Sequence, residues 1–553
     1  MSIEIAEESP VEAIKRSSDL LRGELDAELT NASPDVSKTS EQLLKFHGIY
    51  AQDNRDTRRE RSLAKESLDY IYMARVVIPG GALSSEQWLA LDSLADEVAD
   101  GTLRLTTREA VQLHGVIKGG LRTLATKLDE RWLTTFGGCG DVVRNVVVCP
   151  SLHHGGDDTS FGGVAQRLAL HFRANTQAHW EIFVNGERAV TRESNERAFY
   201  GETYLPRKFK IAIASPHENC VDVFAQDVGL VPGIHPEAGR GFNLIVGGGL
   251  GRSYSHANTF ARLGSVVAFV RDDEVIETIA AIVDAYRELG DRGERKRARL
   301  KYVIADLGIA GFVAHVESRL GRGLRAPLTL APFGHDDHLG WRRLAGGTWQ
   351  LGLRVSAGRV RDQGDLRLRS AVRALAQRGG LAFHLTPLQD LIVSGVADHD
   401  RVSIDELLRS HGVRFEDELG VIERTALACP ALPTCGQALA EAERRLPELV
   451  DALEGELARS SAARRPLQLR MTGCPNGCAR PAVAEIGVVG RTKTTYDLVL
   501  GGSPRGDRLA RTYREKVSME EIPGVIGPLF ERWGREGIEG ESFGDFVTRA
   551  QIA

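Results

Sequence analysis

Four cysteines stand in two short, turn-rich segments near the C-terminus. Cys429 and Cys435 lie in ACPALPTCG, and Cys474 and Cys478 lie in RMTGCPNGCARP, which gives C-x5-C, a long intervening stretch and C-x3-C. Four thiolates bind either a tetrahedral zinc ion or a 4Fe–4S cluster. Structural zinc prefers cysteine pairs separated by two to four residues, and C-x5-C is wider. The pattern therefore favours an iron–sulfur cluster over zinc, and also over four ordinary buried thiols.

The segment that carries the second cysteine pair also contains Gly473, Pro475, Asn476 and Gly477. These residues shape a loop whose backbone N–H groups can point at cluster sulfurs, and such hydrogen bonds tune a cluster's reduction potential. The other three cysteines are far from this set and are not spaced as ligands. We expect them to be structural thiols; they are Cys139, Cys149 and Cys220.

Basic residues recur in the first half of the chain. They are Arg75, Arg104, Arg108, Arg144 and, in YLPRKFK, Lys208 and Lys210. In a strand, Lys208 and Lys210 point to one face and Phe209 to the other. Two lysines and two arginines that converge on one pocket would bind a small dianion and supply protons, whereas Arg104 and Arg108 could pair with the carboxylates of a large acidic cofactor. The alternative is a solvated edge strand guarded by lysines.

Two further segments have an open interpretation. DRGERKRARLKY (291–302) is either a surface helix end or a contact for an acidic cofactor or protein partner. VGGGLGR (246–252) lacks the spacing of a dinucleotide or P-loop motif, but its glycines would let the backbone lie flat against a ring system.

Composition narrows the class of protein. The chain has 553 residues, with 70 Lys and Arg against 75 Asp and Glu, and a net charge of −5. This balance argues against nucleic-acid and membrane-surface binding, which usually need a basic excess. No apolar stretch is long enough for a membrane span, and the acidic N-terminus has no secretory signal pattern. We expect a reducing, cytoplasmic setting.

The sequence contains an internal repeat. GTLRLTTREAVQLHGV (101–116) is similar to GLAFHLTPLQDLIVSGV (380–396), and VVVCP (146–150) is similar to ALACP (426–430). Both matches have the same offset, since Thr106 corresponds to Thr386 and Pro150 to Pro430. A duplicated two-part unit predicts an α+β fold with pseudo-twofold symmetry and a ligand between the halves.

The repeat also divides the chain into expected parts. They are a partly flexible N-terminal arm (1–62), two half-lobes (63–135 and 334–408), a first lobe that contains Arg144, Lys208 and Lys210 (136–333) and a second lobe that contains the four cysteines (409–553).

Individual elements follow from hydrophobic periodicity. Residues 273–289 show the i, i+3, i+4, i+7 pattern of a helix, with Gly290 placed as a C-terminal cap. Runs of β-branched and aromatic residues predict strands at 144–148, 208–214, 242–246 and 496–500.

These motifs together resemble the siroheme and 4Fe–4S sulfite and nitrite reductase family over about residues 40–550. The similarity runs through FHGIYAQDNRDTR, RVVIPGG, GTLRLTTREAVQLHGV, YLPRKFK, FNLIVGGG, ACPALPTCGQALAEAERRLPEL and SFGDFVTRA. ALPTC followed by AEAER, and TGCPNGCARP, are most similar to assimilatory sulfite reductase. In the second repeat, His384, Gln389 and Asp390 depart from the family's RLT-x-x-QN pattern.

The resemblance implies a three-lobed fold with siroheme between the lobes. It implies that the half-lobes 63–135 and 334–408 are ferredoxin-like, that the first lobe (136–333) binds siroheme and that the second lobe (409–553) carries the 4Fe–4S cluster. It implies that Cys478 bridges the cluster and the siroheme iron, that Cys429, Cys435 and Cys474 hold only the cluster, and that Arg75, Arg144, Lys208 and Lys210 bind the substrate anion. It also implies cofactor contacts from Arg104, Thr106, Arg108, His114, Asn243, Gly247, Gly248, Gly249 and Asn476.

The implied reaction is the six-electron reduction of sulfite to sulfide. The same scaffold also carries nitrite reductases, which convert nitrite to ammonia, and a zinc-stabilised structural or binding protein is the alternative from another class. Because we find no nicotinamide or flavin motif, electrons must come from another protein, either ferredoxin or a flavoprotein reductase subunit. GTLRLTTREAVQLHG and CARP are closer to ferredoxin-dependent members, and Arg464 and Arg465 are candidate docking residues.

Overall fold

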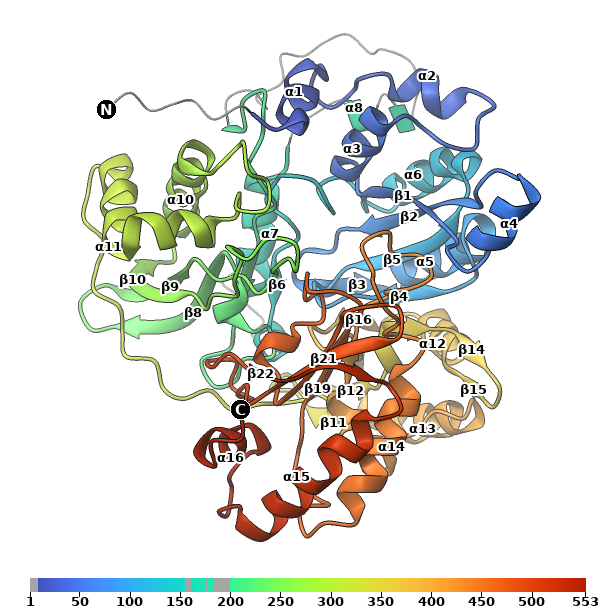
Figure 1. Cartoon of the computed structure of the whole chain (residues 1–553), viewed down its shortest axis with the longest axis vertical. Coiled ribbons are helices and arrows are strands. Elements are labelled where there is room, and N and C mark those ends of the chain that lie inside the picture. Colours follow the sequence, from blue (N-terminus) through green and yellow to red (C-terminus); the bar gives the residue numbers. More distant parts are fainter. Residues whose placement is uncertain (1–7, 155–160, 175–177, 181, 184–198) are drawn as a thin grey trace.

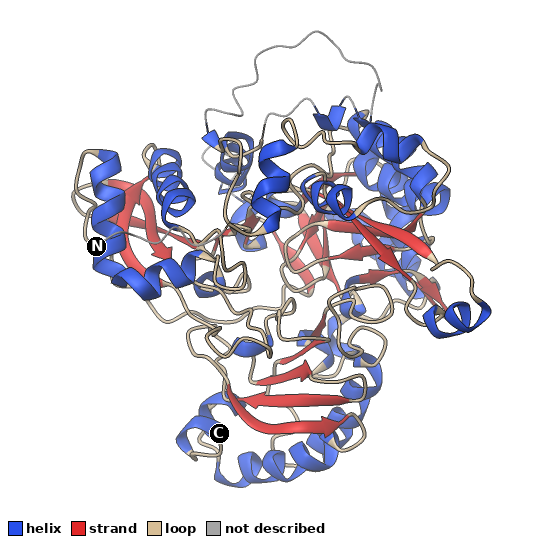
Figure 2. Cartoon of the chain, turned by 45° about the horizontal axis from the view of Figure 1, so that its top comes forward, coloured by secondary structure: helices blue, strands red, loops and turns tan. Residues whose placement is uncertain are grey.

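The computed structural model describes residues 8–154, 161–174, 178–180, 182–183 and 199–553. These residues form three lobes that meet at the centre of the molecule (Figures 1 and 2). One lobe combines two five-stranded sheets, and each of the other two is built on a single five-stranded sheet. Among the described residues, no helix is both long and apolar enough to cross a membrane.

The composite lobe contains two five-stranded sheets, each built mainly from one half of the chain. Its first sheet has the order β1 (Ile49–Asp53), β2 (Tyr70–Val76), β5 (Val111–Val116), β4 (Leu103–Leu105), β13 (Arg359–Val360). Its second has the order β11 (Gly340–Arg343), β12 (Trp349–Leu353), β17 (Leu391–Val396), β16 (Ala382–Leu385), β3 (Ala82–Ser84). The helices of this lobe are α5 (Ser85–Val98), α6 (Leu121–Asp129), α12 (Leu368–Gln377) and α13 (Arg401–Ser410).

Each of the other two lobes pairs one sheet with its own helices. The first has the strand order β6 (Val147–Val148), β7 (Ile211–Ile213), β8 (Val228–His235), β9 (Gly239–Val246), β10 (Ser265–Arg271), with helices α7 (Phe161–His171), α10 (Val275–Leu289) and α11 (Leu300–Leu320). The second has the order β18 (Leu427–Ala428), β19 (Leu469–Thr472), β20 (Ile486–Gly490), β21 (Thr495–Leu500), β22 (Arg511–Ser518), with helices α14 (Leu446–Ala458), α15 (Ile522–Glu536) and α16 (Phe543–Arg549).

The topology confirms the predicted duplication. In both single-sheet lobes the first three strands are parallel and the last two antiparallel. Thr106 and Thr386 have the same structural role in the two halves. The Oγ1 atom of each accepts hydrogen bonds from two backbone N–H groups of the turn that follows. The similarity between the two segments therefore reflects an equivalent β-turn in each half.

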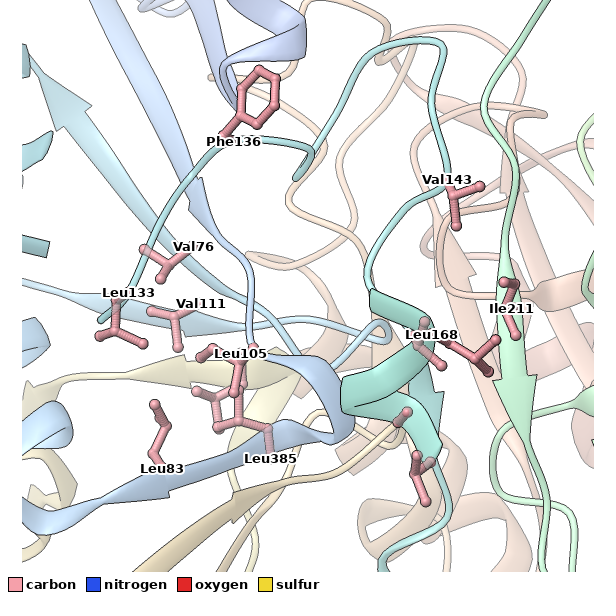
Figure 3. Close-up of a cluster of buried hydrophobic side chains, with 14 of the residues drawn as sticks. Val76, Leu83, Leu105, Val111, Leu133, Phe136, Val143, Leu168, Ile211 and Leu385 are labelled. Carbon is pink, nitrogen blue, oxygen red and sulfur yellow. The ribbon is translucent and has the colours of Figure 1, made fainter. Parts of the chain in front are cut away.

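The two halves exchange one strand each, which the sequence did not predict. β3, from the first half, pairs with β16, and β13, from the second half, pairs with β4. Leu83 of β3 accordingly lies beside Leu385 of β16 and near Leu105 of β4 in one continuous apolar core (Figure 3). Neither half-lobe sheet is complete within 63–135 or 334–408.

The predicted helix at 273–289 is confirmed as α10, and its apolar positions face the core: Ile279, Ile282, Val283 and Tyr286 are buried. Gly290, however, is not a left-handed cap, since its φ is −72°. A Cβ there would lie 2.6 Å from Pro206 Cγ, so the glycine serves close packing. The four predicted strands are confirmed, but β6 and β7 are shorter than 144–148 and 208–214.

The N-terminal segment differs from the expected flexible arm. Residues 1–7 lie outside the described part, but the following residues form helices α1 (Pro10–Ser17), α2 (Leu25–Thr30), α3 (Lys38–Phe46) and α4 (Arg58–Ala64), and β1 extends the first sheet. Leu25 and Leu44 are fully buried. A few well-spaced leucines anchor a segment whose overall composition is polar.

Candidate cofactor and anion site

The two cysteine turns meet at one edge of a sheet. Cys429 follows β18, and Cys474 and Cys478 follow β19, its parallel neighbour, so both turns leave the same end of the sheet. The Gly473 N–H lies 3.4 Å from Cys429 Sγ, and Asn476 Nδ2 lies 3.5 Å from Cys474 Sγ. N–H groups therefore point at two of the sulfurs, as the loop composition predicts.

The four thiols act on one another electrostatically. Burial raises the pKa of Cys429, and Cys478, Cys435 and Cys474 raise it further. Burial, with Cys478 next, also raises the pKa of Cys474 to about 11. Three of the cysteines are buried or half-buried, but Cys478 is exposed. One of the four sulfurs is therefore open to a second partner.

Geometry separates a cluster from a single ion at this place. Sulfurs that bind one zinc ion, each at about 2.3 Å, must lie close together. Among the described residues, no three of these four sulfurs lie within 4.8 Å of one another. A cubane cluster, in which each thiolate binds a different iron, takes the wider spacing. The cysteines fit a 4Fe–4S cluster.

Residues far away in the sequence hold these turns in place. Arg55 Nη1 donates to the carbonyls of Cys435 (3.2 Å) and Ala438 (2.7 Å). Thr107 Oγ1 donates to the Cys478 carbonyl at 3.1 Å, and the Glu443 N–H donates to the Cys429 carbonyl at 3.2 Å. The RLTTR motif of the first half thus covers the cysteine turn of the second.

Lys208 and Lys210 precede β7 in the first half. Burial, with Arg207 and Arg299 adding to it, lowers the pKa of Lys208 to about 7, whereas Cys478 opposes the shift. Burial and then Lys208 hold the pKa of Lys210 well below its usual range. Among the described residues, neither ammonium group has a hydrogen-bond acceptor or an ion-pair partner, so both positive charges lack a counter-ion within this part of the chain.

Arg75 and Arg144 converge on the loop 137–140. Arg75 Nη1 donates to Cys139 Sγ at 2.7 Å, and Arg144 donates from Nε and Nη2 to the Gly140 carbonyl at 2.9 and 2.7 Å. Neither guanidinium has a carboxylate partner among the described residues. Burial lowers the pKa of Arg75, but Cys139, Tyr50 and then Cys478 outweigh burial and raise this pKa above its ordinary value. These four basic residues, Arg75, Arg144, Lys208 and Lys210 (the basic quartet), therefore share one electrostatic environment with Cys478.

Arg104 is already paired within the protein. Its Nε lies 2.8 Å from Glu443 Oε2, its Nη2 donates to the Ala428 carbonyl at 2.8 Å, and Arg359 also binds Glu443. Arg104 thus positions the strand that leads into Cys429. Its contact with a cofactor carboxylate, implied by the resemblance, would have to compete with Glu443.

The side chains of Arg108, His114 and Thr106 differ in how far their hydrogen bonds are satisfied within the protein. Arg108 donates to Gln226 Oε1 (3.0 Å) and to backbone carbonyls, and burial, with Arg144 next, lowers its pKa to about 9. His114 Nδ1 is buried without a hydrogen-bond partner in the described structure, and burial lowers the pKa of His114 well below its usual value. Only Arg108 Nε and His114 Nδ1 of these side chains lack a hydrogen-bond partner in the described structure, whereas Thr106 Oγ1 accepts the N–H groups of its own turn.

The glycine loop (246–252) packs closely against neighbouring backbone and is hydrogen-bonded to it. The N–H groups of Gly247, Gly248 and Gly249 all donate to protein carbonyls, and a Cβ at Gly248 would lie 2.1 Å from the Phe224 carbonyl oxygen. Asn243 bonds to Leu328 through both amide atoms. The loop nevertheless reaches the site, because the Arg252 N–H donates to the Pro475 carbonyl at 3.0 Å.

The basic segment 291–302 turns inward. Arg292 pairs with buried Glu12 of α1 at 2.5 Å, Arg295 with Asp141 at 2.9 Å and Arg299 with Asp227 at 2.8 Å. Its main role is therefore neither a solvated helix end nor a docking surface.

The residues of the second repeat that depart from the family pattern bond within the protein. Asp390 pairs with Arg354 at 2.9 Å, and His384 forms a hydrogen bond with Ser394 at 2.9 Å.

Comparison with known proteins agrees with this arrangement. The model of the nitrite and sulphite reductase 4Fe-4S domain matches residues 164–324 and 422–552, and that of the nitrite/sulfite reductase ferredoxin-like half domain matches residues 64–131. The chain belongs to the nitrite and sulfite reductase family. The family resemblance read from the motifs is thereby confirmed.

Relatives in this family match over the whole length. The sulfite reductase (NADPH) hemoprotein beta-component of Myxococcus xanthus is 42% identical and that of Paenibacillus sp. is also 42% identical, each over 98% of this chain and over 96% and 95% of the relative. The solved structure of the Mycobacterium tuberculosis NirA protein superposes with a TM-score of 0.80 at 26% identity, covering 99% of this chain and 98% of that one. The expected fold is confirmed.

Several residues that shape the site of this family member were not identified from the sequence. Glu443, Arg359 and Arg55 anchor the cysteine turns, and Tyr50 lies under Arg75, whose Cζ is 5.7 Å from the ring centroid. Arg55 and Tyr50 fall within FHGIYAQDNRDTR and Glu443 within AEAER. The motifs marked these segments, but only the fold shows what each side chain touches.

Proposed function

We propose that the chain is a sulfite reductase that carries out the six-electron reduction of sulfite to sulfide with release of water. The observation that carries the proposal is the exposed Cys478 beside two half-buried lysine side chains, Lys208 and Lys210, that have no anionic partner among the described residues. Cys429, Cys435, Cys474 and Cys478 would hold a 4Fe–4S cluster, and Cys478 would also bind the siroheme iron. These groups, when bound, supply electrons and an iron that takes the anion.

The side chains of the quartet would do the remaining work. Arg75 and Arg144 are fixed by the loop 137–140 and offset the charge of an oxyanion. Because the pKa of Lys208 is about 7, its ammonium group can release a proton to a substrate oxygen at neutral pH and recover it from solvent. Lys210 keeps the local potential positive when an anion is present to raise its pKa.

Nitrite reduction to ammonia is the second candidate, because the same four cations would bind nitrite. The names of the full-length relatives support sulfite. Steady-state kinetics with each anion test the choice: we expect a higher kcat/KM for sulfite and stoichiometric sulfide. A much higher value for nitrite with negligible sulfide would overturn it.

An absorption spectrum tests the alternative from another class of protein. A purified protein without siroheme absorption bands and without iron would leave only a zinc-stabilised structural or binding protein.

We further propose that electrons arrive from NADPH through a flavoprotein partner. The relatives' names support this donor, whereas two sequence segments favour ferredoxin. An assay that compares reduced ferredoxin with an NADPH-linked flavoprotein at equal concentrations decides between them. Turnover with ferredoxin alone would contradict the proposal.

A further inference from the structure

A second group of ligating side chains lies apart from the four cluster cysteines. Cys149, Glu218, Cys220 and His338 each place one ligand atom within 4.8 Å of the others. All four are buried, with exposed fractions of 0%, 6%, 1% and 2%. Cys149 and Cys220, which we expected to be structural thiols because they are not spaced as ligands, are brought together by the fold from distant positions of the chain.

Sheet topology explains how the group assembles. Cys149 directly follows β6, and Glu218 and Cys220 lie on the loop after β7, the parallel neighbour of β6, so all three leave the same end of the sheet. His338 comes from the segment between α11 and β11 that joins the two halves of the chain. The Gly334 N–H donates to the His217 carbonyl at 2.7 Å and docks that segment against the loop.

The side chains are oriented as ligands. His338 Nε2 points into the group and lies 3.4 Å from Glu218 Oε1. Its Nδ1 faces Asp336 Oδ2 at 3.8 Å, and Asp336 is held by Arg342. In metal sites, a histidine ligand usually binds the metal through one ring nitrogen while a carboxylate lies next to the other ring nitrogen. Nε2 of His338 and the Asp336 carboxylate have these two positions.

The remaining contacts of Glu218 leave it suited to the same role. Its Oε1 accepts from Cys149 Sγ, lies 3.6 Å from Cys220 Sγ and lies 3.5 Å from Ser151 Oγ, whereas Oε2 accepts the Cys220 N–H at 2.9 Å. One carboxylate oxygen thus faces both sulfurs and the imidazole, and the backbone fixes the other.

We infer that Cys149, Glu218, Cys220 and His338 bind one zinc ion in a closed, four-coordinate structural site. Two thiolates, an imidazole and a carboxylate form a ligand set that zinc accepts, and a buried site with four protein ligands leaves no position open for a substrate. A divalent ion would also offset the negative charge of deprotonated thiols and a carboxylate that are otherwise shielded from water.

The position of the site gives the ion a role. Two residues after Cys220, Asp222 pairs with Arg470 at 2.5 Å and with Arg480 at 2.9 Å, and Arg480 also donates to the Val221 carbonyl at 3.2 Å. Arg480 follows Cys478 by two residues. A zinc ion at Cys220 would therefore stiffen the loop that supports the cysteine turn, and would tie the first lobe to the segment that joins the halves.

Elemental analysis and X-ray absorption at the zinc edge test the inference on the intact holoprotein, produced with zinc in the medium. Neither measurement depends on activity, and the zinc edge is not affected by the iron cofactors. We expect about one zinc per chain, with two sulfurs near 2.3 Å and two nitrogen or oxygen ligands at about 2.0–2.1 Å. Absence of zinc, a shell of four sulfurs, or a shell of nitrogen and oxygen alone would overturn it.

Variants locate the ion. His338→Gln and Cys220→Ser should lower the zinc content at least tenfold, whereas His335→Gln, in the same connecting segment but outside the group, should retain it. Iron content, measured in the same samples, reports whether the cluster site is intact. Zinc retained by both ligand variants, or a disulfide between Cys149 and Cys220 in the isolated wild-type protein, would contradict the assignment.

Discussion

Replacing Glu443 by Gln should destabilise the protein by removing one charge from a buried network. Glu443 lies between Arg104, at 2.8 Å, and Arg359, at 2.6 Å, and its side chain is 13% exposed. Its backbone N–H also holds the Cys429 carbonyl. The substitution keeps the shape of the side chain but leaves two guanidinium groups without their counter-ion.

The pKa of Glu443 gives the size of the effect. Burial raises this pKa, but the guanidinium groups of Arg104 and Arg359 outweigh burial and hold it at about 2, against an ordinary value of 4.5. At about 1.4 kcal/mol per pKa unit, the charge contributes about 3 kcal/mol to the free energy of unfolding at neutral pH. Loss of one partner of a buried ion pair costs a similar amount, about 3–5 kcal/mol.

Urea denaturation of the holoprotein, followed by circular dichroism and by cluster absorption, measures the loss. Because the pKa is lowered, the contribution is complete above pH 4.5 and disappears as the pH falls towards 2, so the difference between wild type and variant should be equal at pH 6 and pH 8. Glu441→Gln is the matched control: its partner Arg444 is 46% exposed, so the loss should stay below about 1 kcal/mol. Equal losses for the two variants would refute the reasoning.

Three further predictions concern the anion site and the cysteine turn. The KM for nitrite, which stays a monoanion near neutrality, should rise by up to about tenfold from pH 6 to pH 8 as Lys208 loses its proton, and Lys208→Arg should flatten this profile; a slope that the variant keeps would exclude Lys208 as its source. Lys208→Met should raise the midpoint of thermal unfolding, because burying the ammonium group is costly below its ordinary pKa, while kcat/KM for sulfite falls at least tenfold; a lower midpoint would contradict this. Cys478→Ser should abolish sulfite reduction and alter the siroheme absorption spectrum, and full turnover would rule out a bridging thiolate.

Local patterns predicted the elements that depend on local residues. The periodicity of Ile279, Ile282, Val283 and Tyr286 was sufficient for α10, and the repeated turn at Thr106 and Thr386 was sufficient for the duplication. The cysteine spacing and the basic motifs also indicated the correct family. In each of these cases the relevant contacts lie within a few residues, or the motif is distinctive by itself.

Long-range pairing was beyond the reach of those patterns. β13 has two residues and β3 has three, too few to show a period, so their exchange between halves left no signal. Arg104 looked like a cofactor ligand because its partner Glu443 is 339 residues away. Cys149 and Cys220 were not spaced as ligands for the same reason, since the parallel pairing of β6 and β7 is what brings them together.

The strand exchange has a consequence for synthesis of the chain. The first sheet is finished by β13 at Arg359–Val360, which the ribosome makes long after β4 at Leu103–Leu105. During that interval one edge of β4 is unpaired and open to pairing with another nascent chain. Closing so long a loop is also slow. The first half therefore cannot complete its folding when its own last residue emerges, and a chaperone that shields this edge during translation would raise the yield of active protein.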